Sequence, residues 1–224
     1  MMFSRLDRLS TLGAGLLVLA CGGGGGSGGM GPCVPGAATQ LVKTSGDPAT
    51  WYFNNPLPTA LSVTARDASG CPVPGVVVNW AVASGDGAIS PAQSTTNASG
   101  VATTADSLGS TSPQTVTATF TGLPTAVTFT ASATTPPASA AVTVSNNNFN
   151  PDNSVIQSGG TVKWTWAAGA DPHNVTFTSG PTPLPPSSAT QNTGSHSATI
   201  TTVGTYDYHC TIHAGMDGTV RVVH

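Results

Sequence analysis

Charged side chains are scarce in this chain. Asp, Glu, Lys and Arg make up 7% of its 224 residues, and the formal net charge is -3. Only 6 residues are Lys or Arg, and they form no cluster after the first few positions. Binding to a nucleic-acid backbone requires a strongly basic surface, so the composition excludes that class of function.

Helical periodicity is also lacking. No segment beyond the N-terminus carries an apolar repeat of 3.6 residues that is long enough to indicate a helix. The chain is instead rich in Thr, Ser, Ala, Val, Gly and Pro. Thr and Val favour strands, whereas Gly and Pro mark turns. The sequence therefore predicts an all-β protein of two small domains.

The N-terminus has no apolar run long enough to span a bilayer. The run from Leu12 to Ala20 follows Arg5 and Arg8 and ends directly before Cys21, which is typical of a targeting signal. Residues 1–20 resemble a bacterial lipoprotein signal, which implies lipidation of Cys21; a plain secretory signal is the alternative. Residues 21–37 are Gly-rich and are expected to form a flexible tether. We expect an exported protein, lipid-anchored in the cell envelope at the outer membrane, on its periplasmic side or at the cell surface.

Residues 38–133 read as short strands separated by turn signals. The strand-like segments are 61–65, 76–82, 115–120 and 127–131, and the turns are 85–87 and 97–100. About seven strands at this spacing predict an antiparallel sandwich with Trp80 in its core. We see no metal or catalytic cluster in this region, and interpret its scattered acids as turn or surface residues: Asp67, Asp86 and Asp106.

Three segments carry a family resemblance for this first domain: ASGCPVPGV, VNW and TTNASGVA, at residues 68–76, 78–80 and 95–102. With them the region resembles bacterial immunoglobulin-like domains of the invasin and intimin type. The resemblance implies a spacer or an interaction module. Residues 134–138 then form a linker that two prolines stiffen, and the second domain covers residues 139–224.

A thiol, an imidazole and a thioether follow one another at intervals of three residues near the C-terminus. Cys210, His213 and Met216 lie in a segment that reads as strand, tight loop and strand, so their side chains can converge on one ion. His173, just after the strand at 162–166, supplies a second imidazole. By strand alternation, His209 points away from this site.

These four ligand types select the metal. Two imidazoles, one thiolate and a weak axial thioether form the type 1 (blue) copper site. Zinc also binds Cys and His, but Met is a poor zinc ligand, and structural zinc sites show paired Cys or His spacings. A buried Cys among core histidines, with no metal, is the remaining alternative. We predict one copper ion held by four residues: His173, Cys210, His213 and Met216.

The ligand loop, together with FNP at 149–151, GGTV at 159–162 and GTY at 204–206, resembles the plastocyanin/amicyanin group of cupredoxins. The resemblance implies a cupredoxin-like Greek-key sandwich. It also implies that Asn174, beside His173, steadies the Cys loop. The two residues between His213 and Met216 match the short loop of amicyanin. The long Pro-rich loop at 178–195 is assigned no chemistry, and we expect His196 to be solvated.

The resemblance implies one-electron transfer, with a redox partner protein docking near His213. Because protein ligands fill every position at the metal, we expect an electron carrier without a small-molecule substrate rather than an enzyme. Two alternatives stay open: an envelope protein that binds or delivers copper, and a surface adhesion or scaffold protein acting through residues 38–133.

The remaining cysteines are Cys33 and Cys71, since Cys21 is assigned to lipid and Cys210 to metal. In an oxidising compartment the pair can form a disulfide, and the alternative is two unpaired thiols. We favour the disulfide.

Overall fold

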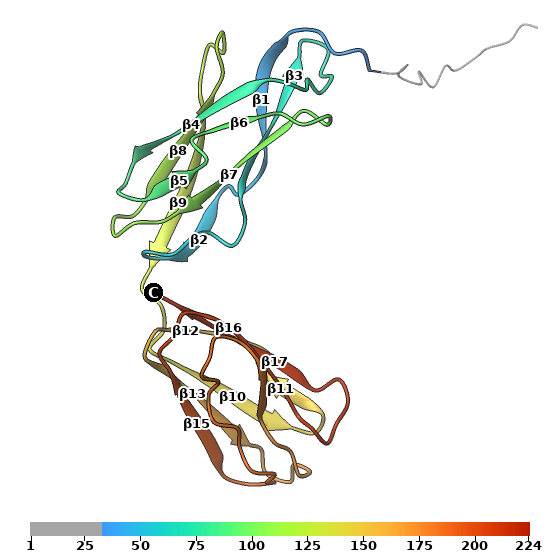
Figure 1. Ribbon diagram of the computed structural model, residues 1–224, viewed down its shortest axis with the longest axis vertical. Helices are drawn as coiled ribbons and strands as arrows, with labels where there is room; N and C mark the ends of the chain where they lie inside the picture. Colours follow the sequence, from blue (N-terminus) through green and yellow to red (C-terminus); the bar gives the residue numbers. More distant parts are fainter. Residues whose placement is uncertain (1–32) are drawn as a thin grey trace, which may run out of the picture. The chain divides into compact units, whose positions relative to one another are not determined.

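The computed structural model describes residues 33–224. The predicted signal at 1–20, Cys21 and most of the tether lie outside the described residues. The described part contains strands and no helix, which confirms the all-β prediction (Figure 1). Accordingly, no helix in this part is long and apolar enough to cross a membrane.

Two groups of strands follow the two predicted domains. The first domain contains β1 (Ala38–Ser45), β2 (Ala49–Tyr52), β3 (Leu61–Asp67), β4 (Val77–Ser84), β5 (Ala88–Ser90), β6 (Gln93–Thr95), β7 (Val101–Ser107), β8 (Gln114–Thr119) and β9 (Val127–Thr134). The second contains β10 (Ser139–Ser145), β11 (Asn148–Asn150), β12 (Asn153–Gln157), β13 (Gly160–Trp166), β14 (Thr176–Ser179), β15 (Ser195–Ile200), β16 (Gly204–His209) and β17 (Asp217–Val223).

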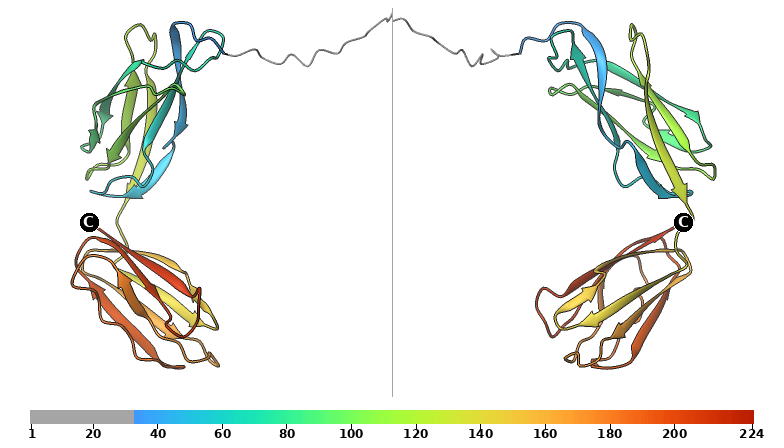
Figure 2. Two further views of the ribbon diagram at one scale, coloured as in Figure 1. Left: turned by 45° about the vertical axis from the view of Figure 1, so that its right-hand side comes forward. Right: turned by 180° about the vertical axis from the view of Figure 1, so that it is seen from behind.

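The first domain is a sandwich of two sheets with the strand orders β1-β3-β7-β5 and β2-β9-β8-β4-β6 (Figures 1 and 2). Its core lies between the sheets, where Trp80 is 3% exposed and lies 5.8 Å from Phe129, ring centroid to ring centroid. Trp80 is therefore a core residue, as predicted. The structure has more strands here than the seven expected, because β5 and β6 are three-residue strands too short to show alternation.

Of the three acids assigned above to turns or the surface, Asp67 and Asp106 are buried, which corrects a surface position for both. Asp106 lies on the inner face of β7, where its carboxylate accepts a hydrogen bond from Nε2 of Gln114. Burial raises the pKa of Asp106. Its amide partner comes from β8, so no local pattern reveals it. Asp86 is exposed in its turn, as predicted.

Asp67 is the second buried acid, at the end of β3. Its carboxylate accepts hydrogen bonds from the backbone N–H groups of Gly36 (2.8 Å), Ser69 (2.9 Å) and Cys71 (2.9 Å). Cys33 and Cys71 are both disulfide-bonded, which agrees with the favoured state of these thiols, while their pairing with each other stays a prediction. Asp67 thus connects the turn at Cys71 to the segment around Gly36, at the start of the first domain.

The second domain packs the sheet β11-β10-β13-β15 against the sheet β12-β17-β16-β14. Strand alternation directs Val162, Trp164 and Trp166 of β13 inward, and all three are buried, as predicted. Tyr206 and Tyr208 of β16 face them from the other sheet and are also buried. The same face of β16 continues into Cys210, so the core packing directs this thiol inward.

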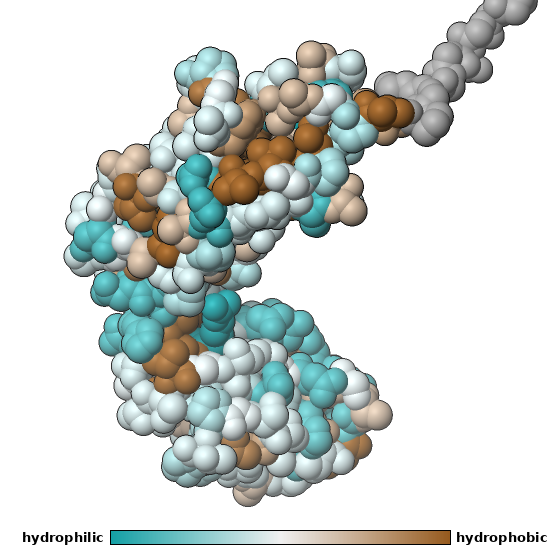
Figure 3. Space-filling view, turned by 45° about the horizontal axis from the view of Figure 1, so that its top comes forward, coloured by the Kyte–Doolittle hydropathy of each residue, from teal (hydrophilic) through white to brown (hydrophobic). Residues whose placement is uncertain are grey.

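The visible surface reflects the shortage of charge. Pale colours of intermediate hydropathy cover most of the face shown in Figure 3, and strongly hydrophilic residues are scattered among them. Only a few large apolar residues are well exposed in the described part of the chain, among them Ile212 (50%) and Val203 (37%).

We predict that Asp67→Ala lowers the midpoint of thermal unfolding at pH 7. The backbone N–H of Gly36, with those of Cys71 and Ser69, lowers the pKa of the Asp67 carboxyl below its usual value of 3.8. A carboxyl whose pKa is lower in the folded state stabilises the fold above the unfolded-state pKa, and this stabilisation is lost as the pH falls below it. The difference between wild type and variant should therefore shrink below about pH 4. Thermal unfolding followed by circular dichroism from pH 3 to pH 7 tests this; a difference independent of pH contradicts it.

Candidate metal centre

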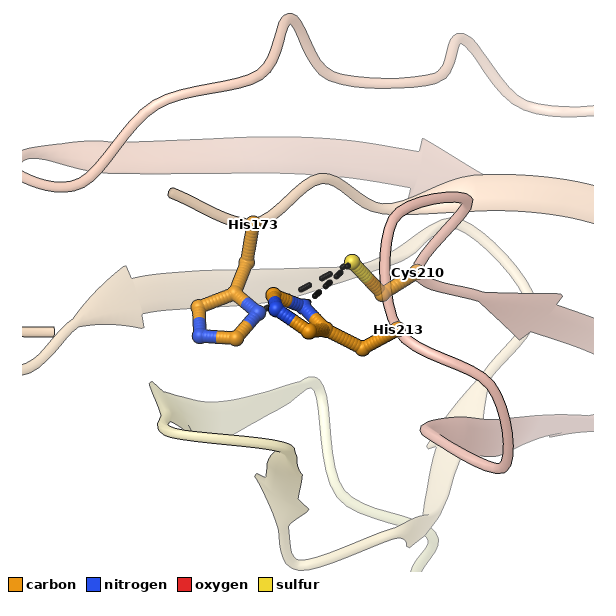
Figure 4. Close-up of side chains that lie close together, drawn as sticks. All are labelled: His173, Cys210 and His213. Carbon is orange, nitrogen blue, oxygen red and sulfur yellow. Dashed lines mark hydrogen bonds between the residues drawn. The ribbon is translucent and has the colours of Figure 1, made fainter. Parts of the chain in front are cut away.

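Three of the four predicted ligands converge at one end of the second domain. Sγ of Cys210 lies 3.8 Å from Nδ1 of His173 and 3.6 Å from Nδ1 of His213 (Figure 4). The ligand atoms of these three residues all lie within 4.8 Å of one another. The two imidazole centroids are 4.5 Å apart. Each ring turns its Nδ1 toward the sulfur, so one ion can contact all three donors.

The ligand loop is closed by its own backbone. The N–H of Cys210 donates to the carbonyl of Met216 (3.0 Å), and the N–H of Met216 donates to the carbonyl of His213 (3.4 Å). Gly215 has φ of +77°, a left-handed conformation that favours glycine. Met216 is 2% exposed and belongs to the same core cluster as Cys210. The side chain of Met216, with its thioether, is therefore buried in the core cluster that also contains Cys210.

The two imidazoles differ in their surroundings. His173 is fully buried, whereas His213 is partly exposed. Desolvation lowers the pKa of His173, and the neighbouring His213 lowers it further, against the opposing effect of Asp171. His173 is thus kept neutral near pH 7, which is the protonation state that binds a metal. Cys210 is the buried free cysteine of the described residues.

Asn174 connects the segment before β14, which carries His173, to the loop that carries Cys210. Its Oδ1 accepts from the backbone N–H of Thr211 (2.9 Å), and its Nδ2 donates to Oγ1 of Thr211 (2.7 Å) and of Thr190 (3.2 Å). The pairing of β14 with β16 explains this contact, because the register Thr176↔His209, continued by two residues, places Asn174 opposite Thr211. Asn174 therefore lies where the family resemblance places it.

Packing between Tyr208 and Gly218 fixes the position of the strand that leads to Cys210. Tyr208 is 1% exposed, and its ring lies over Gly218 of β17, where a Cβ would overlap the phenol. Gly218 pairs directly with Tyr208 in the ladder between β16 and β17. Glycine at position 218 therefore leaves the space that the Tyr208 ring occupies.

The Pro-rich loop before β15 is more than a surface loop. The backbone N–H groups of His173 and Gln191 each donate to the other residue's carbonyl, both at 2.9 Å. Gln191 of this loop therefore pairs with His173 through the backbone, and no periodic pattern in the loop sequence indicates this pairing. His196 is partly exposed, and its Nε2 lies 2.9 Å from the carbonyl of Pro186.

The donor set fits copper. The buried thiol of Cys210 and the Nδ1 atoms of His173 and His213 form a group of three donors. The thioether of Met216 is buried in the same core cluster as Cys210. This combination matches the trigonal set of soft donors, with a weak axial thioether, that binds copper. A structural zinc site would need a fourth His, Cys or carboxylate, and the group found in residues 33–224 contains three. His173, Cys210, His213 and Met216 thus form a candidate type 1 copper site.

We predict that Gly218→Ala destabilises the second domain by about 1–3 kcal/mol, because the added methyl group must displace the buried Tyr208 ring. The displacement also moves the strand that carries Cys210, so copper affinity should fall with stability. Gly215→Ala is the comparison, since a Cβ there meets open space and only the positive φ is strained. Chemical denaturation of both metal-free variants measures the effect. Equal or smaller destabilisation by Gly218→Ala would show that Tyr208 moves freely.

Comparisons with known proteins follow the same division of the chain. Residues 54–135 match the bacterial Ig-like domain (group 1), and residues 138–223 match the copper binding proteins of the plastocyanin/azurin family. A search of curated proteins found no match.

Similar solved structures are cupredoxins. An oxidised amicyanin mutant is 31% identical, covering 38% of this chain and 82% of that chain, with a TM-score of 0.34. A mutant plastocyanin of fern is 30% identical, covering 38% of this chain and 100% of that chain, with a TM-score of 0.32. Through residues 138–223 the chain belongs to the plastocyanin/azurin family of copper-binding proteins, preceded by a group 1 bacterial Ig-like domain.

Proposed function

We propose that this protein carries single electrons in the bacterial cell envelope by cycling one copper ion between Cu(I) and Cu(II). The observation that carries the proposal is the convergence of Cys210 Sγ with the Nδ1 atoms of His173 and His213 in a buried site. Thiolate and thioether suit Cu(I), and imidazole suits both oxidation states. A sandwich that fixes these donors lets both states share one geometry.

The exposure of the ligands supports an electron carrier without a substrate of its own. His173, Cys210 and Met216 are all at most 4% exposed, so no ligand position opens to a small molecule from their side. His213 alone is partly exposed, in a shallow depression of about 390 Å³ that Ile212, Ala214 and Gly215 also line. A redox partner protein that docks on this surface would contact His213 directly.

The location is part of the proposal. Disulfide-bonded Cys33 and Cys71 favour an oxidising compartment outside the cytoplasm. We infer a lipid anchor at Cys21, a tether over residues 21–37, and an Ig-like domain at residues 38–133 that holds the copper domain away from the membrane. Mass spectrometry of the mature protein tests the anchor directly, since a lipid on Cys21 changes the mass of the N-terminal peptide.

The colour of the copper-loaded protein tests the copper site itself. Cu(II) added to the metal-free protein should produce an intense blue colour by charge transfer from the Cys210 thiolate, and Cys210→Ala should abolish it. His209→Ala is the matched control, because His209 is the adjacent residue and points to the other face of β16. It should keep the colour. Visible absorption and electron paramagnetic resonance measure both; a colourless Cu(II) complex of the wild type contradicts the proposal.

The rate of electron self-exchange distinguishes electron transfer from copper delivery. Ile212→Lys places a charge on the surface beside His213, so two copies repel each other there and electron self-exchange should slow on the order of tenfold. Val203→Lys is the control, since Val203 is also exposed but precedes β16, at the opposite end from Cys210. Line broadening in mixtures of Cu(I) and Cu(II) protein gives the rates. Slow exchange in the wild type, with rapid loss of copper to a chelator, would instead indicate copper delivery.

A further inference from the structure

The Pro-rich loop contacts the site at a position that the copper ligands do not explain. Gln191 and His173 form an isolated antiparallel bridge in which each N–H donates to the other's carbonyl at 2.9 Å. The preceding residue in the loop, Thr190, accepts a hydrogen bond from Asn174 (3.2 Å). The loop therefore forms hydrogen bonds both to the predicted ligand His173 and to Asn174, the next residue in the chain.

Two buried nitrogen atoms at this bridge have no hydrogen-bond partner. One is Nε2 of His173, the ring nitrogen that is not directed at Cys210. The other is Nε2 of Gln191. If Nδ1 of neutral His173 binds the metal, its proton must reside on Nε2, so a buried N–H requires an acceptor there. An unpaired buried donor costs about 1–3 kcal/mol.

The bridge places these two side chains next to each other. In a hydrogen-bonded antiparallel pair the Cα atoms are about 5.5 Å apart, and both side chains leave on the same face. The side-chain amide of Gln191 is long enough to reach the imidazole of its partner. A half-turn about its last bond exchanges amide nitrogen for oxygen and gives Nε2 of His173 an acceptor.

We propose that Gln191 is a positioning residue of the copper site. Its side-chain oxygen accepts the Nε2–H of His173, which fixes the tautomer with a free Nδ1 and holds the ring in the plane that faces Cys210. This inference rests on the proposed role of His173 as a copper ligand. Metal-binding histidines generally need such a partner on their second nitrogen, and its loss lowers metal affinity.

Gln191→Met tests the proposal, because it preserves the length of the side chain and the backbone bridge but removes the acceptor. We expect copper affinity to fall about 10-fold to 100-fold. In the Cu(I) protein, the nitrogen-bound proton of His173 Nε2, observed by ¹⁵N-resolved NMR, should shift and exchange with water faster, while the ring signals of His213 stay unchanged. Gln157→Met on β12 makes the same chemical change at the edge of another strand and should alter neither quantity.

Gln191→Glu separates this role from simple packing of the loop. Glu keeps an acceptor oxygen at the same reach, so copper affinity and the slowly exchanging Nε2–H should persist. A packing role predicts that Met and Glu behave alike, since both preserve the backbone bridge. An unchanged Nε2–H signal and copper affinity in Gln191→Met overturn the inference. If the wild type forms no blue Cu(II) complex, the proposed function fails instead.

Discussion

The site depends on one constraint: three metal-binding atoms must be held within 4.8 Å of one another inside a protein core. Burying such polar groups costs free energy unless each finds a partner, and no side chain provides a rigid position alone. The backbone therefore supplies the rigidity. The hydrogen bond from the Cys210 N–H to the Met216 carbonyl closes the ligand loop. Two backbone hydrogen bonds with Gln191 fix the position of His173.

The packing of aromatic side chains in the core determines where the strand before Cys210 lies. Trp164 contacts Tyr208 and Phe177 with ring centroids 5.3 Å and 5.8 Å apart, in edge-to-face arrangements. Tyr208 is two residues before Cys210 on the same face of β16, so the packing of its ring also sets where the thiol points. Gly218 makes room for that ring on the neighbouring strand. The position of the sulfur thus depends on the packing of β16 against residues of three other strands, β13, β14 and β17.

Local patterns made much of this predictable. Cys210, His213 and Met216 follow one another at three-residue intervals within one short segment. The strand at 162–166 shows alternation, and its inward residues are buried as that alternation requires. Thr190 and Gln191 were missed because their loop has no period, and their contacts come from residues 16 and 18 positions away in the chain. Asp106 was assigned wrongly for a similar reason, since its partner Gln114 lies on another strand.

The asymmetry between the two histidines links the structure to the proposed function. His173 is fully buried and tied by its backbone to the Pro-rich loop, so its position can change little when the copper ion changes its charge. His213 has a partly exposed ring on the loop between Cys210 and Met216, beside an exposed Ile212. Electron transfer between proteins needs a short path from the metal to the surface. With the other ligands at most 4% exposed, the shortest path through the ligand shell runs through the imidazole of His213. Under the proposed function, the buried His173 would hold the geometry of the site and the partly exposed His213 would face the redox partner.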